Sequence, residues 1–445
     1  MFYKDLFDRR VDLKICVIGG GASGMTAAIA AASSGAAVTL LERGPRVGKK
    51  ILMTGNGKCN LGNLEICGEY YHTDDPSRME HLLELFGVRD TIAYFRNLGL
   101  ITTDRGGYLY PLSGQAASVL DVLRYDLEAL GVEVLVNTKA DDVTKTAEGF
   151  LVTGTVTIPD ETDDKKGTTK AFRGTYDKVI LSCGGKAAPK TGSDGNGYRI
   201  ASKLGHTVRP VRPALCALYT KENLKPISGV RSQALLGLIC DGEAIASEYG
   251  ELQLTDYGIS GIPVFQLSHE AGRVLEEERE LKVLIDFLPG ISDDEFEAMI
   301  SGRNLLLAGR TLEEYFTGVL NKKLMQFFLK KAGLNGADSL EAVMKYKPKQ
   351  LRMVWELCRE FTVTIDHLAD YDAAQTSVGG VPLSEVRDSM ESLLVPGLFF
   401  TGEMLNVDGR CGGYNLQWAW TSGHLAGENA ANGSVSYKGC FSDTN

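Results

Sequence analysis

The chain has 445 residues, 44% of them hydrophobic, and its 47 basic and 57 acidic side chains give a formal net charge of −10. This length predicts two or three domains, and the composition is typical of a globular protein with a sizeable core. The acidic balance counts against nucleic acid or an anionic membrane as a partner, because both attract basic surfaces, and it favours a small-molecule substrate.

Cysteine and histidine usage argues against a metal or disulfide framework. The nine cysteines are scattered, odd in number and form no C-x-x-C pair, and the six histidines are dispersed. We therefore expect no metal site and a reducing, cytoplasmic location. The first residues are charged and lack the apolar run of a signal peptide, and no stretch approaches the about 20 apolar residues of a membrane span.

The most informative segment, residues 14–43, reads KICVIGGGASGMTAAIAAASSGAAVTLLER. It predicts a strand, a glycine-rich turn, a small-residue helix and a second strand, with G-x-G-x-x-G at Gly19, Gly21 and Gly24. Gly19 permits the tight turn, Gly21 lets the backbone approach a pyrophosphate, and Gly24 lets helix and strand pack closely. Glu42 ends the second strand, where it can accept hydrogen bonds from ribose. An ordinary βαβ unit would not require that carboxylate.

The rest of the N-terminal half predicts further helices and strands. Helical spacing of apolar residues and composition indicate two helices, a strand with a turn, a hairpin and a buried strand: 78–100, 115–130, 131–143, 144–175 and 176–185. The polar tract 159–170 inside the hairpin has the composition of a solvated loop.

After Arg209 the pattern changes to short β-like runs separated by prolines, which predict an antiparallel β domain. From about residue 290 it becomes helical, and two capping-box pairs, Ser292 with Glu295 and Thr311 with Glu314, mark helix starts. Apolar residues between 312 and 320 then predict one buried helical face. The helical block closes at 347–361. Segment 361–381 predicts β-structure again, and 393–431 predicts a strand, a glycine-rich loop and a helix that return to the first sheet.

Several features favour FAD over NAD as the dinucleotide. The chain holds one full fingerprint, and an extended FAD needs contacts far beyond the first βαβ unit. Three further glycine-rich elements, 53–63, 182–198 and 402–417, can approach a planar ring closely. A helix that starts near 414–416 would direct its positive end at the flavin pyrimidine.

These elements resemble BaiN-type bacterial flavoproteins, a family of NAD(P)/FAD-dependent oxidoreductases related to glutathione reductase and fumarate reductase flavoproteins. The resemblance covers nearly the whole chain. It rests on VIGGGASGMTAA, KKILMTGNGKCNLGN, VILSCGGKAAPKTGSDGNGY, LTDYGISGIP and GEMLNVDGRCGGYNLQWAWTSG. The last segment is the most specific, because so long a match does not arise by chance.

The resemblance implies an α/β fold: a Rossmann-like FAD-binding domain (1–208 and 366–445), a nested β-rich, barrel-like domain (209–288 and 361–378) and a small helical domain (289–360). It also implies a set of cofactor-binding residues that contact pyrophosphate, ribose, adenine and isoalloxazine. These are Gly19, Gly21, Ala22, Ser23, Gly24, Glu42, Arg43, Lys49, Lys50, Asn56, Gly57, Cys59, Asn60, Ala140, Gly184, Gly402, Glu403, Gly413, Tyr414, Asn415 and Leu416.

This sequence departs from the family pattern at three positions. Asp256 stands where His is common, Tyr108 where Arg is frequent, and Cys411 where Thr is frequent. If Arg and His bind substrate anions in other members, this protein takes a more neutral substrate.

Three residues are candidates for proton transfer beside the flavin: Tyr108, Tyr110 and Asp256. The alternatives are an aromatic packing pair for the two tyrosines and a simple turn for Asp256. The main alternative to proton transfer by these residues is thiol chemistry, with Cys59 at the flavin and Cys411 as its partner in space.

The sequence thus predicts an FAD-dependent reductase that passes hydride to a C=C bond conjugated to a ketone, as in a steroid or bile-acid-like enone. NAD(P)H or another donor would supply the electrons. Two alternatives stay open: a flavin-dependent oxidase of a small amine that uses O₂, and a non-catalytic flavin-binding regulatory or RNA-associated protein.

Overall fold

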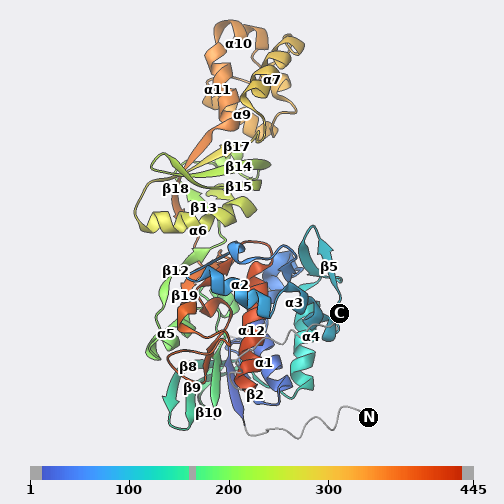
Figure 1. Ribbon diagram of the computed structural model, residues 1–445. Helices are drawn as coiled ribbons and strands as arrows, with labels where there is room; N and C mark the ends of the chain where they lie inside the picture. Colours follow the sequence, from blue (N-terminus) through green and yellow to red (C-terminus); the bar gives the residue numbers. More distant parts are fainter. Residues whose placement is uncertain (1–12, 160–166, 433–445) are drawn as a thin grey trace. The chain divides into compact units, whose positions relative to one another are not determined.

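The computed structural model describes residues 13–159 and 167–432. The chain divides into two compact units: unit 1 contains Met1–Arg212 and Thr376–Asn445, and unit 2 contains Pro213–Gln375 (Figure 1). The predicted fold class is confirmed, because unit 1 is built on a parallel sheet and unit 2 on a closed barrel. The finer division of the inserted segment into a β-rich and a helical domain stays a prediction.

A five-stranded parallel sheet forms the centre of unit 1. Its order is β20-β11-β1-β2-β7, so the first strand lies in the middle and the chain adds strands on both sides of it. The central strands are apolar and buried, as expected for a parallel sheet that is covered on both faces. Their bounds are β1 Lys14–Ile18, β2 Ala37–Leu41, β7 Glu133–Leu135, β11 Lys178–Leu181 and β20 Leu398–Phe400.

The first and the last helix of unit 1 pack closely against each other, because the side chains between them are small or absent. Helix α1 (Ala22–Ser33) is rich in alanine, and α12 (Tyr414–Asn432) carries Gly423 and Gly427 one turn apart. A Cβ at Gly423 would lie 2.5 Å from the Ser23 carbonyl oxygen, and one at Gly427 would overlap that of Ala27. This close approach brings the two ends of the chain to one sheet, as the sequence predicts.

Smaller elements complete unit 1. The small sheets of the described residues are β3-β6-β5, β10-β9-β8, β21-β4 and β12-β19. Their strands are β3 Gly62–Asn63, β4 Tyr71–Thr73, β5 Thr102–Arg105, β6 Tyr108–Pro111, β8 Thr138–Thr146, β9 Gly149–Pro159, β10 Gly167–Tyr176, β12 Arg209–Ala214, β19 Thr376–Gly380 and β21 Val407–Gly409. The helices are α2 Pro76–Leu85, α3 Val88–Asn97, α4 Ala116–Ala129 and α5 Asn196–Lys203, with 3₁₀ turns η1 Ile51–Gly57, η2 Gly68–Tyr70, η3 Pro189–Thr191, η5 Leu383–Glu385 and η6 Gly402–Met404.

Three predicted elements of unit 1 differ in detail. The single helix expected over 78–100 is two helices, because the chain turns extended at Phe86 and Gly87, and Asp90 caps the second helix. The segment 131–143, expected to be a strand followed by a turn, contains β7 and a turn at Asn137, which has a left-handed φ of 53°, but a second strand, β8, begins at Thr138. The two strands, β7 and β8, belong to different sheets. The buried strand expected over 176–185 covers only β11, and part of the tract 159–170 lies outside the described residues.

Unit 2 contains a closed antiparallel barrel of the order β13-β16-β15-β14-β17-β18. The strands are β13 Leu218–Thr220, β14 Arg231–Cys240, β15 Glu243–Leu254, β16 Gly258–Ser260, β17 Leu281–Asp286 and β18 Phe361–Leu368. Helix α6 (Ile262–Glu276) and the 3₁₀ turn η4 (Lys225–Ile227) belong to the same unit. The predicted antiparallel β-structure is therefore present.

The helical part of unit 2 continues the hydrophobic core of the barrel. Its helices are α7 Asp293–Leu306, α8 Leu312–Phe316, α9 Lys322–Lys331, α10 Leu340–Tyr346 and α11 Pro348–Arg359. Both predicted capping boxes are formed, at Ser292 and at Thr311. The apolar face expected over 312–320 is only partly helical: α8 ends at Phe316, and Val319 and Leu320 pack against the same core from the following turn.

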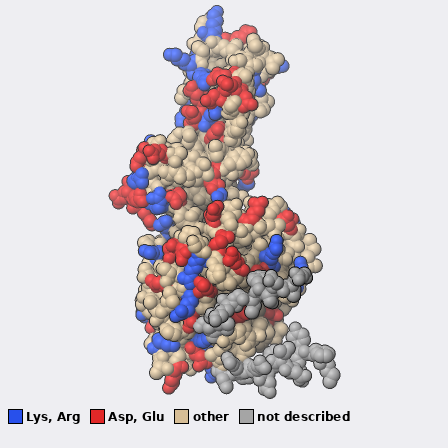
Figure 2. Space-filling model, viewed as in Figure 1, with Lys and Arg blue, Asp and Glu red and all other residues tan. Residues whose placement is uncertain are grey.

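The distribution of charged side chains and the apolarity of the helices agree with what the composition predicts. Acidic and basic side chains are interspersed on the face shown in Figure 2. Among the described residues, none of the helices combines the length and apolarity that crossing a membrane requires.

Candidate cofactor and substrate site

The loops that the sequence singles out follow the carboxyl ends of the parallel strands. The Gly19 amide donates to the Leu41 carbonyl (2.8 Å), which ties the ends of β1 and β2 together. On the other side, the hydroxyls of Ser182 after β11 and Thr401 after β20 are hydrogen-bonded at 2.6 Å and buried. Ligands of open α/β sheets bind at this edge, where the strand order reverses about the first strand.

The glycine-rich turn has the geometry that its sequence predicts. Gly19 has a φ of +113°, which disfavours any side chain, and a Cβ at Gly24 would overlap the Gly19 carbonyl oxygen. A Cβ at Gly21, in contrast, would meet no atom within 4 Å. The turn is therefore closed toward the protein and open at Gly21, which leaves room for a phosphate group.

The first turn of α1 borders this opening. Its first intrahelical hydrogen bond runs from the Met25 amide to the Gly21 carbonyl (3.0 Å), so the amides of Ala22, Ser23 and Gly24 precede the helical ladder. These amides and the positive end of the helix dipole suit a phosphate. Gly402 lies directly beside Ser23, since a Cβ at Gly402 would lie 2.8 Å from the Ser23 hydroxyl oxygen.

Glu42 is buried and its carboxylate is held in place. It accepts the Gly20 amide (3.0 Å) and the Gly44 amide (2.6 Å). Burial raises the pKa of Glu42, while these two amides and nearby Arg43 and Lys49 act in the opposite direction. Each carboxylate oxygen keeps a further lone pair, so the oriented group can also accept from ribose hydroxyls.

The three predicted basic residues each have a partner. Lys50 pairs with Glu403 (2.6 Å), another predicted site residue. Lys49 donates to the Lys190 carbonyl (2.5 Å), and Arg43 forms an ion pair with Asp194. These cations therefore hold loops of the site together, and Lys50 joins the segment after β2 to the segment after β20.

Two further predicted cofactor residues, Ala140 for the adenine and Gly184, are fastened by polar side chains of one loop. The Ala140 carbonyl in β8 accepts the Asn196 side-chain amide (2.8 Å). Gly184 follows β11 with a φ of +73°, and a Cβ there would lie 2.6 Å from the Ser193 hydroxyl oxygen. Asn196 and Ser193 thus fasten these positions from the loop before α5.

The loop at η1 is the third predicted contact. Asn56 and Cys59 both have left-handed φ values, 53° and 58°, an unusual conformation for residues other than glycine. The Asn60 side-chain carbonyl oxygen is buried and has no hydrogen-bond partner within the described structure. A buried acceptor without a partner is costly, and a ring N–H of a bound cofactor would satisfy it. The donor set and the open turn at Gly21 therefore fit FAD.

Cys59 does not have the properties of a redox-active thiol. It is fully buried, and burial raises its pKa to about 12. Burial also raises the pKa of Cys411. A nucleophilic cysteine needs a thiolate near neutral pH, so both residues are better explained as packing residues of their loops.

The start of α12 is assembled from several segments. The Asn415 side chain accepts the Gly409 amide (2.9 Å) and donates to the Gly409 carbonyl (2.7 Å). The Tyr71 hydroxyl donates to the Tyr414 carbonyl (2.9 Å), and burial raises the pKa of Tyr414 to about 12. Because the Asn415 amide group is used internally, the backbone amides of the first helical turn, including that of Leu416, are the groups left for a ligand.

The start of α12 also touches strand β3, which follows the η1 loop. A Cβ at Gly413 would lie 2.5 Å from the Gly62 carbonyl oxygen, and the Asn63 side chain donates to the Gly412 carbonyl (3.3 Å). The Trp418 indole donates to the Gly402 carbonyl (3.1 Å). Through these contacts, elements from three distant parts of the sequence meet in unit 1.

The candidate proton donors are divided between the two units. Tyr108 and Tyr110 lie on β6; Tyr108 packs against Gly412, and Tyr110 lies beside Gly55. Partial burial, with smaller contributions from Tyr108 and Cys411, raises the pKa of Tyr110. Asp256 belongs to unit 2, at the tip between β15 and β16.

Sequence reasoning missed the aromatic group around α12. The Tyr70 and Tyr71 rings lie 5.2 Å and 6.1 Å from the Tyr414 ring, and the Arg410 guanidinium lies 5.9 Å over Tyr70. The adjacent pair Tyr70–Tyr71 just before a predicted helix was the available signal, but its partner stands more than 300 positions away.

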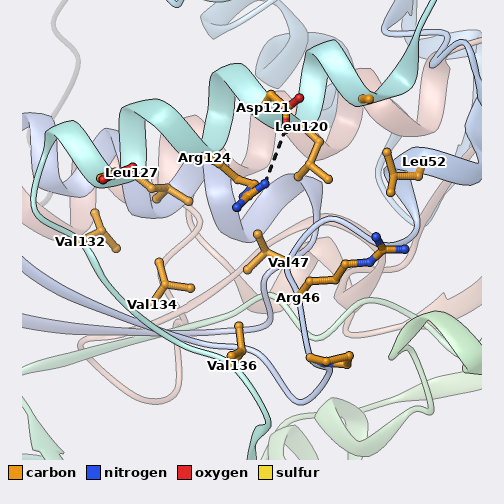
Figure 3. A pocket seen from close by; sticks show the side chains of 13 residues that line it. Arg46, Val47, Leu52, Leu120, Asp121, Arg124, Leu127, Val132, Val134 and Val136 are labelled. Atoms are coloured by element: carbon orange, nitrogen blue, oxygen red, sulfur yellow. Dashed lines mark ion pairs between the residues drawn. The ribbon is translucent and has the colours of Figure 1, made fainter.

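A hollow of about 580 Å³ lies elsewhere in unit 1, between α4 and the segments after β2 and around β7 (Figure 3). Aliphatic side chains line most of it, including Val47, Leu120 and Val134, and Arg124 pairs with Asp121 at its rim (3.5 Å). None of the predicted cofactor residues lines it. This hollow is therefore distinct from the site built by the glycine-rich loops.

Comparison with known proteins identifies the family. The 3-dehydro-bile acid delta(4,6)-reductase of Clostridium scindens is 40% identical over 422 residues, 94% of this chain and 99% of that protein. The ribosomal RNA dihydrouridine synthase of Haemophilus influenzae is 27% identical over 416 residues, 92% and 96% of the two chains. A structure of 3-ketosteroid delta1-dehydrogenase from Sterolibacterium denitrificans aligns with 94% of this chain and 99% of that chain, at 14% identity and a TM-score of 0.49. The model of the HI0933-like protein Rossmann domain matches residues 13–429, which confirms the predicted family resemblance: the chain belongs to the HI0933-like family.

Proposed function

We propose that this protein is an FAD-dependent reductase that saturates a carbon–carbon double bond conjugated to a carbonyl group. The observation that carries the proposal is the assembly at one sheet edge of unit 1. The opening at Gly21, the oriented Glu42 carboxylate and the start of α12 lie there together, and the Tyr108 ring packs against Gly412 in the loop before α12. This arrangement suits an extended flavin dinucleotide with a proton donor close to its ring end.

The names of the relatives support the substrate class. A delta(4,6)-reductase of a 3-dehydro-bile acid acts on double bonds that are conjugated to a ring ketone. Formation of dihydrouridine saturates the uracil C5–C6 bond, which is conjugated to the C4 carbonyl. Both reactions add hydride to the β carbon and a proton to the α carbon. The higher identity of the bile-acid enzyme and the net charge of −10 favour a small steroid-like enone for this chain.

Bound FAD would supply the hydride. The amides of Ala22 and Ser23 would bind the pyrophosphate, and Glu42 would orient the ribose. The amides at the start of α12 would stabilise negative charge on the ring. Tyr110 would hold a proton on its hydroxyl oxygen and donate it to the α carbon, because its raised pKa keeps the phenol protonated at neutral pH. Tyr108 is the second candidate for the proton donor, on the same strand. The remaining predicted cofactor residues would contact FAD from the glycine-rich loops and their neighbouring segments.

We further propose NAD(P)H as the electron donor. The single glycine-rich fingerprint of the chain is taken by FAD, so a nicotinamide would bind only transiently. Absence of a nucleic-acid partner and a cytoplasmic location stay predictions. The dihydrouridine synthase relatives make the first of these directly testable.

An anaerobic absorbance titration tests the proposal. The purified protein with FAD is reduced by NADH or NADPH, and a 3-oxo-4,6-diene bile acid or uridine is then added in separate experiments. A small amine is added to a further sample in which the flavin is still oxidised. We expect reoxidation by the dienone and formation of its saturated product by mass spectrometry. Reduction of the flavin by the amine, followed by rapid reoxidation in air, would establish the oxidase instead. A protein that binds FAD but turns over no acceptor would establish a non-catalytic role.

A further inference from the structure

The hollow of unit 1 between α4 and β7 has the size of a small-molecule site. Its volume of about 580 Å³ lies within the range of sites that bind drug-sized ligands. Its lining residues follow α4 from Ala117 to Glu128, which corresponds to about 17 Å along the helix axis. An elongated ligand therefore suits this hollow better than a compact one.

The lining between α4 and β7 is apolar and partly open to water. Leu120 and Leu127 are buried, whereas Leu52 and Val134 keep part of their surface accessible. β7 is the edge strand of the described parallel sheet, so no further strand of that sheet covers these side chains. An apolar molecule in the hollow would remove them from water, and this burial favours binding.

The segment after β2, which forms one wall of the hollow, is held in place from two sides. The Gly48 amide donates to the Gly20 carbonyl (2.8 Å). Gly48 has a φ of +69° and passes so close to α4 that a Cβ there would overlap the Leu120 side chain. Val47 packs against Gly20, where a Cβ would lie 2.6 Å from the Val47 Cγ1. The wall is thus formed before a ligand binds, which lowers the entropic cost of binding.

A cation without a partner lies at one end of the hollow. Arg46 is exposed, and its guanidinium forms no ion pair or hydrogen bond with any residue of 13–159 and 167–432. Figure 3 shows the Arg46 side chain extending toward Leu52, away from Leu127 and Val132. Arginine binds a carboxylate through two parallel hydrogen bonds, so a carboxylate is the group that suits this end.

The other charged lining residues do not compete with a ligand for Arg46. Arg124 pairs with Asp121 on the same helix (3.5 Å). Glu128 follows Leu127 in the last turn of α4, so it belongs to the end opposite Arg46. The hollow therefore has a positive end, apolar walls and a negative end.

We propose that this hollow is a second ligand site, distinct from the flavin site, for an elongated apolar molecule that ends in a carboxylate. The apolar body lies along α4 between Val47 and Val134, and the carboxylate pairs with Arg46. The inference goes beyond the proposed function and does not depend on it, because none of the lining residues belongs to the predicted cofactor site.

Isothermal titration calorimetry of the FAD-loaded full chain with decanoate measures the dissociation constant. Loading with FAD keeps the probe out of the dinucleotide site. We expect Arg46→Ala to raise the dissociation constant of decanoate about tenfold, because a hydrogen-bonded ion pair is lost. Arg46→Lys, which keeps the charge, should raise it by less than about threefold.

Two further ligands test the apolar body and the charge separately. Octanoate should bind the wild type about tenfold more weakly than decanoate, since two fewer CH₂ groups are buried. Decyltrimethylammonium has the same chain with a cationic head and should bind at least about tenfold more weakly than decanoate. Equal or tighter binding of this cation would assign the hollow to a cationic ligand held at Glu128 and overturn the proposal.

Two variants serve as controls for the position of the site. Arg96→Ala is matched to Arg46→Ala, because Arg96 is an exposed arginine of α3 that does not line the hollow, and it should leave binding unchanged. Val134→Phe places a larger side chain in the hollow and should weaken decanoate at least about tenfold with FAD affinity unchanged. The site is overturned if the wild type does not bind decanoate, if Arg46→Ala or Val134→Phe binds it as tightly as the wild type, or if Arg96→Ala loses as much as Arg46→Ala.

Discussion

The two glycine-rich ends of the cofactor site are held by different means. At Gly19–Gly24 backbone contacts hold the turn in its conformation. Carbonyl and amide groups close the turn, and the Glu42 carboxylate accepts a hydrogen bond from it. At Gly402–Leu416 side chains hold the backbone. Asn63 and Tyr71 come from distant segments, and Asn415, Trp418 and Ser422 come from α12 itself.

This difference predicts how each end responds to a substitution. A turn made by backbone packing has no room for an added atom, so a single methyl group decides whether it forms. At an end held by many side-chain hydrogen bonds, a single substitution removes only one or two of them. Each hydrogen bond contributes about 1 kcal/mol to the free energy of unfolding. We therefore expect all-or-none effects at the first end and graded effects at the second.

The largest effect is expected for Gly24→Ala. The new methyl group would overlap the Gly19 carbonyl oxygen. Helix α1 is packed against α12, and β1 lies in the middle of the sheet, so neither element can shift to make room. Overpacking of this kind costs about 3 kcal/mol. Urea unfolding of the FAD-free protein, followed by circular dichroism, measures the loss. A stability within 1 kcal/mol of the wild type would contradict a turn closed by backbone contact.

Gly21→Ala is the control for this prediction. Its φ of −80° suits alanine, and a Cβ there meets no atom within 4 Å. The FAD-free protein should be as stable as the wild type. FAD affinity should nevertheless fall, because the methyl group occupies the space for the pyrophosphate. A variant with normal stability and normal FAD affinity would show that the cofactor does not approach at Gly21.

The same contrast explains how far the sequence could predict the site. The Gly19–Glu42 segment was predictable because its elements are consecutive and each residue acts on near neighbours. The strand–loop–helix at the C-terminus was predictable as an element, since α12 begins at Tyr414 as expected. Its support was not, because Tyr71 and Asn63 contact it across more than 300 positions, and no local pattern encodes such a pairing.

Element boundaries failed where tertiary packing overrides local periodicity. The helical pattern of 78–100 continues through Phe86 and Gly87, yet the chain breaks there, and Phe86 is buried in the core. Likewise, Val319 and Leu320 keep the helical spacing after α8 has ended at Phe316, because burial in the core requires only that they be apolar.

The second prediction concerns chemistry at the α12 end. Tyr110→Phe removes the proposed proton donor and leaves the ring in place beside Gly55. Loss of a general acid lowers kcat about 100-fold. FAD affinity and the KM for the enone should be unchanged, which separates a chemical role from a structural one. Steady-state assays with the 3-oxo-4,6-diene bile acid measure both constants.

Tyr108→Phe provides the comparison for Tyr110, since both residues lie on β6 and differ in burial. We expect a change in kcat below about threefold. If the two variants exchange these results, Tyr108 is the donor; if neither changes kcat, the proton comes from elsewhere and the assignment to β6 is wrong.

A smaller effect is expected for Asn415→Ala. The substitution removes two hydrogen bonds to Gly409, at 2.9 Å and 2.7 Å, and leaves both backbone groups without their partner. The free energy of unfolding should fall by about 2 kcal/mol, as followed by release of flavin fluorescence in urea. Gln115→Ala is the matched control, an exposed amide side chain that makes no cap hydrogen bond at α4. A cost equal to that of Gln115→Ala would mean that the α12 loop does not depend on Asn415.

A titratable side chain that follows α5, His206, contacts the segment that leads into β20 and the second end. His206 is buried; one ring nitrogen lies 2.7 Å from a Glu385 carboxylate oxygen and the other 2.8 Å from the Ser392 hydroxyl. The Ser392 oxygen also accepts the amides of Leu394 and Val395. Its lone pairs are thereby used, so the hydroxyl must donate to His206, and the neutral ring must donate to Glu385. A protonated His206 would present a second N–H to an oxygen that has no acceptor site left.

Stability at this end should therefore depend on pH, with a sign that the network determines. Burial lowers the pKa of His206, although the Glu385 hydrogen bond acts in the opposite direction. The unfolded chain then binds more protons than the folded one as pH falls below about 6.5, the ordinary histidine value, so stability is present above that pH and lost below it. The slope is at most about 1.4 kcal/mol per pH unit, the limit for one proton. Unfolding of wild type and His206→Gln between pH 5 and 8 measures it. The variant should have a shallower slope in this window, because His424, whose pKa burial also lowers, keeps its own contribution. Gly21→Ala, at the end held by backbone contacts, should keep the slope of the wild type.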